Sequence, residues 1–147
     1  MRNAILTLHI ISSIMALAVT LVIIIRAFLG VFNKVKLTAK DVRFPFIATL
    51  LLYFQLFLGS ILYVFYIIDY SHGAIDMLAE ASSGSRFWAV EHFIMMVFTL
   101  VVAHIGWIFA RNGKTPKLIF QKNILYFGVA CIMIFISMTM NVVKHAL

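Results

Sequence analysis

Four long stretches without a formal charge constrain this chain more than any other feature. Each is long enough for a helix to cross the hydrocarbon core of a bilayer, which is about 30 Å thick and needs about 20 residues. Their apolar residues lack the alternation of barrel strands, and only helices or closed barrels satisfy backbone hydrogen bonds in lipid. The sequence therefore predicts an all-α integral membrane protein. The stretches lie between Arg2 and Arg26, Arg43 and Asp69, Glu91 and Arg111, and Lys122 and Lys144.

These stretches predict a single transmembrane domain, residues 1–147, folded as an up-down-up-down four-helix bundle. The composition agrees, because 64% of the residues are hydrophobic and only 12% are charged. The pattern Ala16-Leu17-Ala18 is typical of a signal-peptide cleavage site, but apolar sequence continues to Ile25, so we expect a retained helix. The predicted helices cover about residues 3–25, 44–68, 87–110 and 124–143.

Charged residues are distributed unevenly over the connections between these helices. Nine basic residues lie in or beside the first and third connections, whereas the second connection and its flanks hold Asp69, Asp76, Glu80 and Glu91. Basic residues favour the cytoplasmic side, so both termini and the second connection are expected outside. The net charge of +7 then indicates contact with anionic membrane lipids or a partner subunit, and not with nucleic acid.

Three histidines, His9, His92 and His104, lie in apolar stretches, where an ionisable side chain is expensive and usually has a partner. His9 shares one stripe of the first helix with Ser13, Ala16 and Thr20, at spacings of four, three and four residues. Small and hydroxylated residues usually face neighbouring helices, so His9 is expected to point into the bundle. His92 is expected to lie on an inward stripe of the third helix.

Depth favours a partnership between His9 and His92. His9 lies seven residues after Arg2, and His92 lies six residues after Arg86. Both helices enter from the same side, so both rings are expected roughly 9–10 Å inside the outer charged boundary. The first and third helices are diagonal in such a bundle. This arrangement predicts one haem with His9 and His92 as its metal ligands.

Further residues are predicted to surround this haem. Small side chains on the inward stripes leave room for the macrocycle, two larger ones pack against it, and two arginines at the outer rim meet the propionates. The alternative is that the two histidines only form hydrogen bonds between helices. The predicted cofactor contacts are Ser13, Gly59 and Thr99 for room, Met96 and Tyr63 for packing, and Arg2 and Arg86 for charge.

Three other side chains in the apolar stretches need an interpretation. Gln55, near the bilayer centre, is expected to form an interhelical hydrogen bond. His104 lies about 120° round its helix from His92, so it is expected to bond a neighbour or, alternatively, to serve a quinone or a proton route. The halves of the other three predicted helices that lie nearer the cytoplasm contain no histidine, so a second histidine pair is not expected. Cys131, the only cysteine, is interpreted as a small packing residue.

Segments of the first three helices resemble small bacterial four-helix membrane proteins labelled cytochrome b-like. The resemblance implies b-type haem bound by His9 and His92, electron transfer in the bacterial inner membrane, and respiratory-chain subunits as partners. Tyr53 stands where members of that family often carry a further histidine. The matching segments are Leu8-His9-Ile10-Ile11, the stretch from Gln55 to Tyr63, and Arg86-Phe87-Trp88-Ala89-Val90-Glu91-His92.

A more distant similarity is to the integral-membrane protoporphyrinogen oxidase family, which has a similar opening and a histidine-containing third helix. That family carries a lysine near the position of His92, and this chain lacks it. No nucleophile–base arrangement or phosphate-binding loop supports hydrolase or kinase chemistry. Three hypotheses follow: a haem protein for electron transfer, a cofactor-free membrane scaffold or assembly subunit, and a haem-dependent protoporphyrinogen oxidase-like enzyme.

Overall fold

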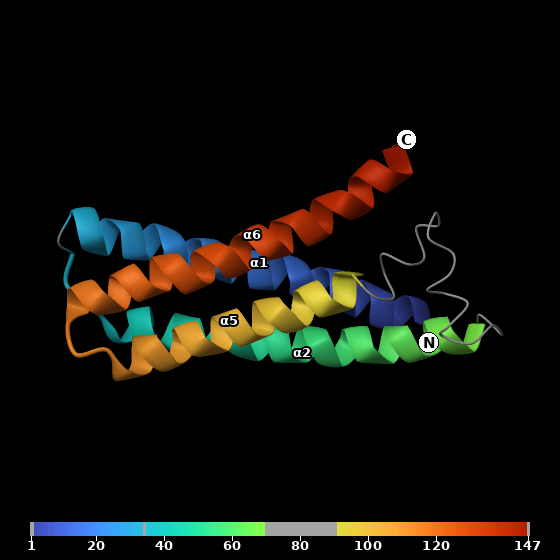
Figure 1. Cartoon of the computed structure of the whole chain (residues 1–147), viewed down its shortest axis with the longest axis horizontal. Helices are drawn as coiled ribbons and strands as arrows, with labels where there is room; N and C mark the ends of the chain where they lie inside the picture. Colours follow the sequence, from blue (N-terminus) through green and yellow to red (C-terminus); the bar gives the residue numbers. More distant parts are fainter. Residues whose placement is uncertain (1, 34, 70–90, 147) are drawn as a thin grey trace.

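The computed structural model describes residues 2–33, 35–69 and 91–146. Within these residues, the regular structure consists of four α-helices that are each long and apolar enough to cross a membrane. This confirms the predicted helical character and the four candidate spans. The helices are α1 (Arg2–Phe32), α2 (Ala39–Asp69), α5 (His92–Asn112) and α6 (Pro116–Ala146), shown in Figure 1.

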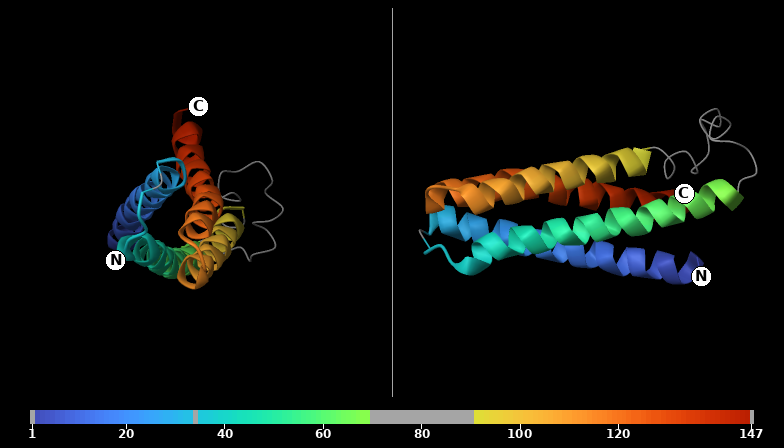
Figure 2. Two further views of the ribbon diagram at one scale, coloured as in Figure 1. Left: turned by 90° about the vertical axis from the view of Figure 1, so that its left-hand side faces the viewer. Right: turned by 90° about the horizontal axis from the view of Figure 1, so that it is seen from below.

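The four helices lie side by side, with α1 packed against α2 and α6, and α5 packed against the same two helices. The helices α1 and α5 therefore face each other across the bundle. The connections from α1 to α2 and from α5 to α6 lie at one end, and both termini lie at the other (Figures 1 and 2). Towards its C-terminal end, α6 diverges from the other helices (Figure 1).

The interior combines small and polar side chains with a few large ones such as Phe120 and Phe127, whereas many large apolar side chains face outwards. Phe57 and Ile94 are each 62% exposed, and Ile132 is 60% exposed. This is the inverse of a soluble core, and it suits lipid outside and close helix packing inside. Every helix contributes at least one alanine that is at most 1% exposed; these are Ala16, Ala27, Ala48, Ala103, Ala110 and Ala130.

The helices α1, α2 and α6 are longer than the uncharged stretches predicted. The helix α2 begins at Ala39, not near residue 44, because Thr38 and Asp41 form a capping arrangement. The backbone N–H and the hydroxyl of Thr38 both donate to Oδ2 of Asp41, at 2.7 and 2.8 Å. These bonds satisfy groups at the helix start, so the helix extends beyond the apolar residues.

The other ends differ for similar reasons. The helix α6 begins at Pro116, not near residue 124, with the hydroxyl of Thr115 accepting the backbone N–H of Leu118 at 3.3 Å. The helix α1 continues past Ile25 to Phe32. For α5, predicted to begin at residue 87, residues 87–90 lie outside the described part of the chain.

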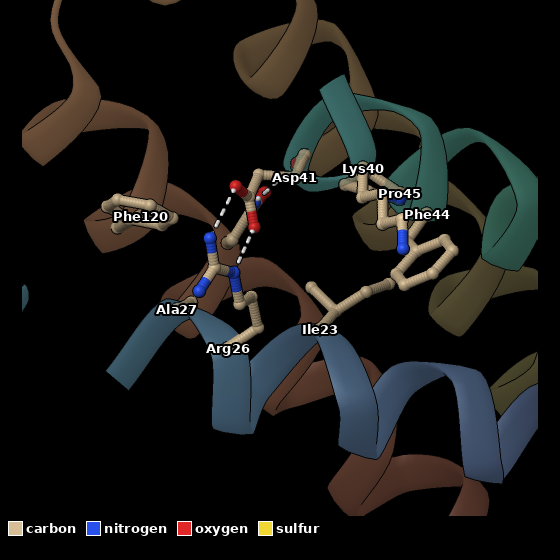
Figure 3. A pocket seen from close by; sticks show the side chains of 9 residues that line it. Ile23, Arg26, Ala27, Lys40, Asp41, Phe44, Pro45 and Phe120 are labelled. Carbon is tan, nitrogen blue, oxygen red and sulfur yellow. Dashed lines mark hydrogen bonds and ion pairs between the residues drawn. The ribbon is translucent and has the colours of Figure 1, made fainter. Parts of the chain in front are cut away.

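An ion pair joins α1 to α2 at the end that carries the two short connections (Figure 3). Nε of Arg26 lies 2.9 Å from Oδ1 of Asp41, and the aspartate side chain is 1% exposed. The amide of Asn123 on α6 donates to the backbone carbonyl of Asp41 at 3.2 Å. A buried carboxylate requires such partners, because an unpaired charge in this position would be strongly destabilising. Three helices are thereby fixed together at this end.

Candidate functional site

The rings of His9 and His92 meet across the bundle. His9 projects from α1 and His92 from the first turn of α5, and their ring centroids are 6.3 Å apart with planes inclined by 65°. Both side chains are half-buried. The structure therefore confirms that two histidines on diagonal helices converge at one level.

This separation has a chemical meaning. A metal-bound imidazole nitrogen lies about 2 Å from its metal, and the ring centre lies about 1 Å further out, so two rings sharing one metal have centroids roughly 6 Å apart. The observed 6.3 Å agrees with that value. The inclination of 65° at this distance is also that of edge-to-face packing between two rings, so the separation is compatible with direct ring contact as well.

Ser137 on α6 orients His92. Its hydroxyl lies 2.8 Å from Nδ1 of the imidazole, and Ser137 is 5% exposed. In metal-bound histidines one ring nitrogen binds the metal while the other forms a hydrogen bond that fixes the ring. The sequence analysis missed Ser137. It lies seven residues before Lys144, so the same depth argument places it at the level of the two histidines.

Gln55 on α2 fixes the backbone at His9. Its side-chain amide donates to the carbonyl of His9 at 2.9 Å. It also forms hydrogen bonds with the hydroxyls of Ser12 and Ser13. The interhelical hydrogen bond predicted for Gln55 is thus confirmed, and Ser12 is a partner that the sequence analysis did not identify.

The ring of His9 sits against Gly59 and keeps one unsatisfied atom. A Cβ added at Gly59 would lie 3.3 Å from Cε1 of His9, closer than most such contacts. Nδ1 of His9 is buried and has no hydrogen-bond partner among the described residues. A buried polar atom without a partner is costly, which makes this ring a candidate to bind a further group.

The other predicted contacts have different surroundings. The hydroxyl of Ser13 is occupied with Gln55 and the carbonyl of His9, and the hydroxyl of Thr99 donates to the carbonyl of Met95 in its own helix. Thr99 is fully buried and Met96 half-buried. The structure thus assigns Ser13 to the α1–α2 contact.

Near the end of the bundle that carries the termini, the Tyr63 ring stacks on Phe93 with centroids 5.8 Å apart. Arg2 is exposed at the start of α1. Arg86, the second predicted propionate partner, lies outside the described residues, as does Trp88. Of the predicted set, His9, His92 and Gly59 are the residues that the structure visibly brings together.

His104 has a partner on α2, as predicted. Nδ1 of His104 lies 3.1 Å from the hydroxyl of Tyr53. The sequence analysis did not identify this partner, although Tyr53 and His104 lie at similar distances from the basic ends of their helices, at Arg43 and Arg111. Cys131 is buried, consistent with a packing role.

Comparison of the chain with protein-family models, curated proteins and solved structures finds no match. The functional assignment therefore depends on the geometry of its own residues.

Proposed function

We propose that this chain is a membrane protein that binds one b-type haem and takes part in electron transfer. The observation that carries the proposal is the 6.3 Å separation of the His9 and His92 rings across the bundle. Two histidine side chains are a donor set that would hold a haem iron. The buried, unpartnered Nδ1 of His9 and the small residue Gly59 beside it support the same interpretation.

The protein's own residues hold and orient the group. His9 and His92 would bind the iron, and the contact between Ser137 and Nδ1 of His92 is the kind of second hydrogen bond that orients a metal-bound ring. Gln55 fixes α1 at the level of His9. Bound haem would supply reversible one-electron transfer, and the apolar surroundings and hydrogen bonds of the two histidines would tune its potential.

The same proposal includes a location and partners. The described basic residues of the first and third connections lie at one end of the bundle, and Figure 2 shows both termini at the other. This separation supports an inner-membrane protein with the termini outside and anionic lipid at the basic end. A respiratory-chain subunit would then exchange electrons with the haem near the outer face.

The test is the absorption spectrum of the full-length protein purified in detergent. A reducible Soret band and α band are expected for the unmodified protein. His9→Ala and His92→Ala should each abolish the spectrum of haem with two histidine ligands, while His104→Ala should leave it intact. Thermal unfolding of every variant reports whether the bundle still folds.

Other outcomes distinguish the remaining hypotheses. A folded protein that stays colourless after haem is added would overturn the proposal and favour a cofactor-free scaffold. Loss of the spectrum in His104→Ala alone would show that the proposed pairing is wrong. Formation of protoporphyrin from protoporphyrinogen by the haem-loaded protein would identify an enzyme and not a carrier.

A further inference from the structure

A second polar pair lies on the membrane-facing side of the α2–α5 contact. The hydroxyl of Tyr53 on α2 meets Nδ1 of His104 on α5 at 3.1 Å, and Tyr53 is 47% exposed. The residues around this pair are large, apolar and exposed, so the pair faces lipid and not the bundle interior. These neighbours are Leu50, Phe57, Val101, Ile105 and Ile108.

The pair retains one hydrogen-bond donor that it cannot use internally. A neutral histidine has one N–H and a tyrosine has one O–H, and their mutual bond uses only one of the two, whichever tautomer is present. Neither side chain has a second hydrogen-bond partner among the residues that the structure describes. In hydrocarbon, a donor without an acceptor is costly. The pair is therefore suited to a lipid-soluble ligand that carries an acceptor oxygen.

Aromatic rings lie beside this donor. The Trp107 ring lies 5.3 Å from the His104 ring at an interplanar angle of 73°. The Phe46 ring lies 5.3 Å from the Trp107 ring at 46°. Aromatic side chains in such a group offer faces and edges against which a flat ring packs favourably. The acceptor is accordingly expected on a planar ring.

The depth of His104 in the membrane excludes the ester carbonyls of phospholipids as the acceptor. His104 lies seven residues before Arg111, so it is roughly 10 Å inside the basic end of the bundle. Ester carbonyls of phospholipids belong to the interfacial region outside the hydrocarbon core. A carbonyl at the level of His104 must belong to a molecule that dissolves in the core.

We propose that Tyr53 and His104 form a binding site for a membrane quinone. One quinone carbonyl accepts the remaining hydrogen of the pair, and the quinone ring packs against Trp107 and Phe46. The site lies on a different face and at a different level from His9 and His92, and its existence does not depend on haem binding.

The test uses the full-length protein in lipid nanodiscs and a photoreactive naphthoquinone, with the cross-linked peptides identified by mass spectrometry. Saturable labelling is expected in residues 46–57 and 101–108, and an excess of unlabelled short-chain naphthoquinone should suppress it. Replacing both groups together, in Tyr53→Phe/His104→Leu, should raise the half-saturating concentration about tenfold, the loss expected for one hydrogen bond, because either group alone still supplies a donor. Tyr126→Phe, which removes the same oxygen from α6, should leave it unchanged.

Three results would overturn the site. The first is labelling spread over all four helices without saturation, and the second is equal affinity in the double variant and the unmodified protein. The third is equal competition by naphthalene, which has the ring but no carbonyl. Competition by naphthalene is measured on the unmodified protein, so it tests the hydrogen bond even if the double variant fails to fold. Labelling is measured on peptides and does not require bound haem. It therefore tests the quinone site even if the protein binds no haem.

Discussion

Gln55 is 4% exposed, and its side chain joins α2 to the backbone carbonyl of His9 and to the hydroxyls of Ser12 and Ser13. These bonds lie directly beside the proposed haem ligand. A buried amide that lost them would leave polar groups on α1 unsatisfied as well. Gln55 therefore determines where α1 sits along and around α2 at this level.

We expect Gln55→Leu to destabilise the folded protein by about 1–2 kcal/mol, because polar groups on both helices lose their partners. The measurement is the thermal unfolding midpoint in detergent, which should fall by a few degrees. Gln121→Leu is the matched control, since Gln121 is exposed on α6, and its midpoint should not change. Equal midpoints for the two variants would show that the α1–α2 bonds contribute nothing.

At the scale of the helices, the close approach of α5 and α6 depends on the absence of a side chain at Gly106. A Cβ added there would lie 2.7 Å from Cβ of Tyr126 and 3.0 Å from Cε2 of Phe127. A Cβ cannot move without its backbone, so the two helices would have to separate. Gly128 on α6 differs, because a Cβ added there meets no other group within 4 Å.

This difference predicts opposite effects of the same substitution. Gly106→Ala should destabilise by about 1–3 kcal/mol through overpacking. Gly128→Ala should be neutral or stabilising by up to about 1 kcal/mol, because alanine restricts the unfolded chain and favours helix. Chemical denaturation in mixed micelles measures both. A stabilising Gly106→Ala would contradict the close α5–α6 contact.

For the whole molecule, function depends on which end of the bundle faces the cytoplasm. The described residues of the end that carries the two short connections include Arg26, Lys36, Lys40, Arg111 and Lys114. Of their charges, that of Arg26 is paired with Asp41. An excess of positive charge at one end favours its retention on the cytoplasmic side. The proposed haem then lies nearer the outer face.

Cysteine labelling tests this orientation. In a Cys131→Ala background, an impermeant maleimide added to spheroplasts should label Asn3→Cys and should not label Asn33→Cys or Asn112→Cys. The latter two should react once the membrane is opened, because both side chains are exposed in the structure. The reverse pattern would place the termini in the cytoplasm, and the basic-end argument would be wrong.

The sequence by itself determined the four helices, the depth of each polar residue and the diagonal relation of the helices that carry His9 and His92. These properties depend on local patterns: the length of an uncharged run, the spacing along a helix, and the count from the nearest charge. They were sufficient to predict that Gln55 and His104 have partners on neighbouring helices. They were not sufficient to identify most of those partners.

Only the tertiary structure decided the rotation of each helix about its axis and the distance between neighbours. Small changes in either quantity determine whether Ser137 reaches His92, whether Tyr53 reaches His104, and how closely Gly59 approaches His9. Helix rotation and helix spacing both arise from the packing of small residues and from hydrogen bonds between helices far apart in sequence. No local sequence pattern therefore predicts them. The helix ends also depended on such contacts, since the buried carboxylate of Asp41 serves Thr38 and Arg26 together.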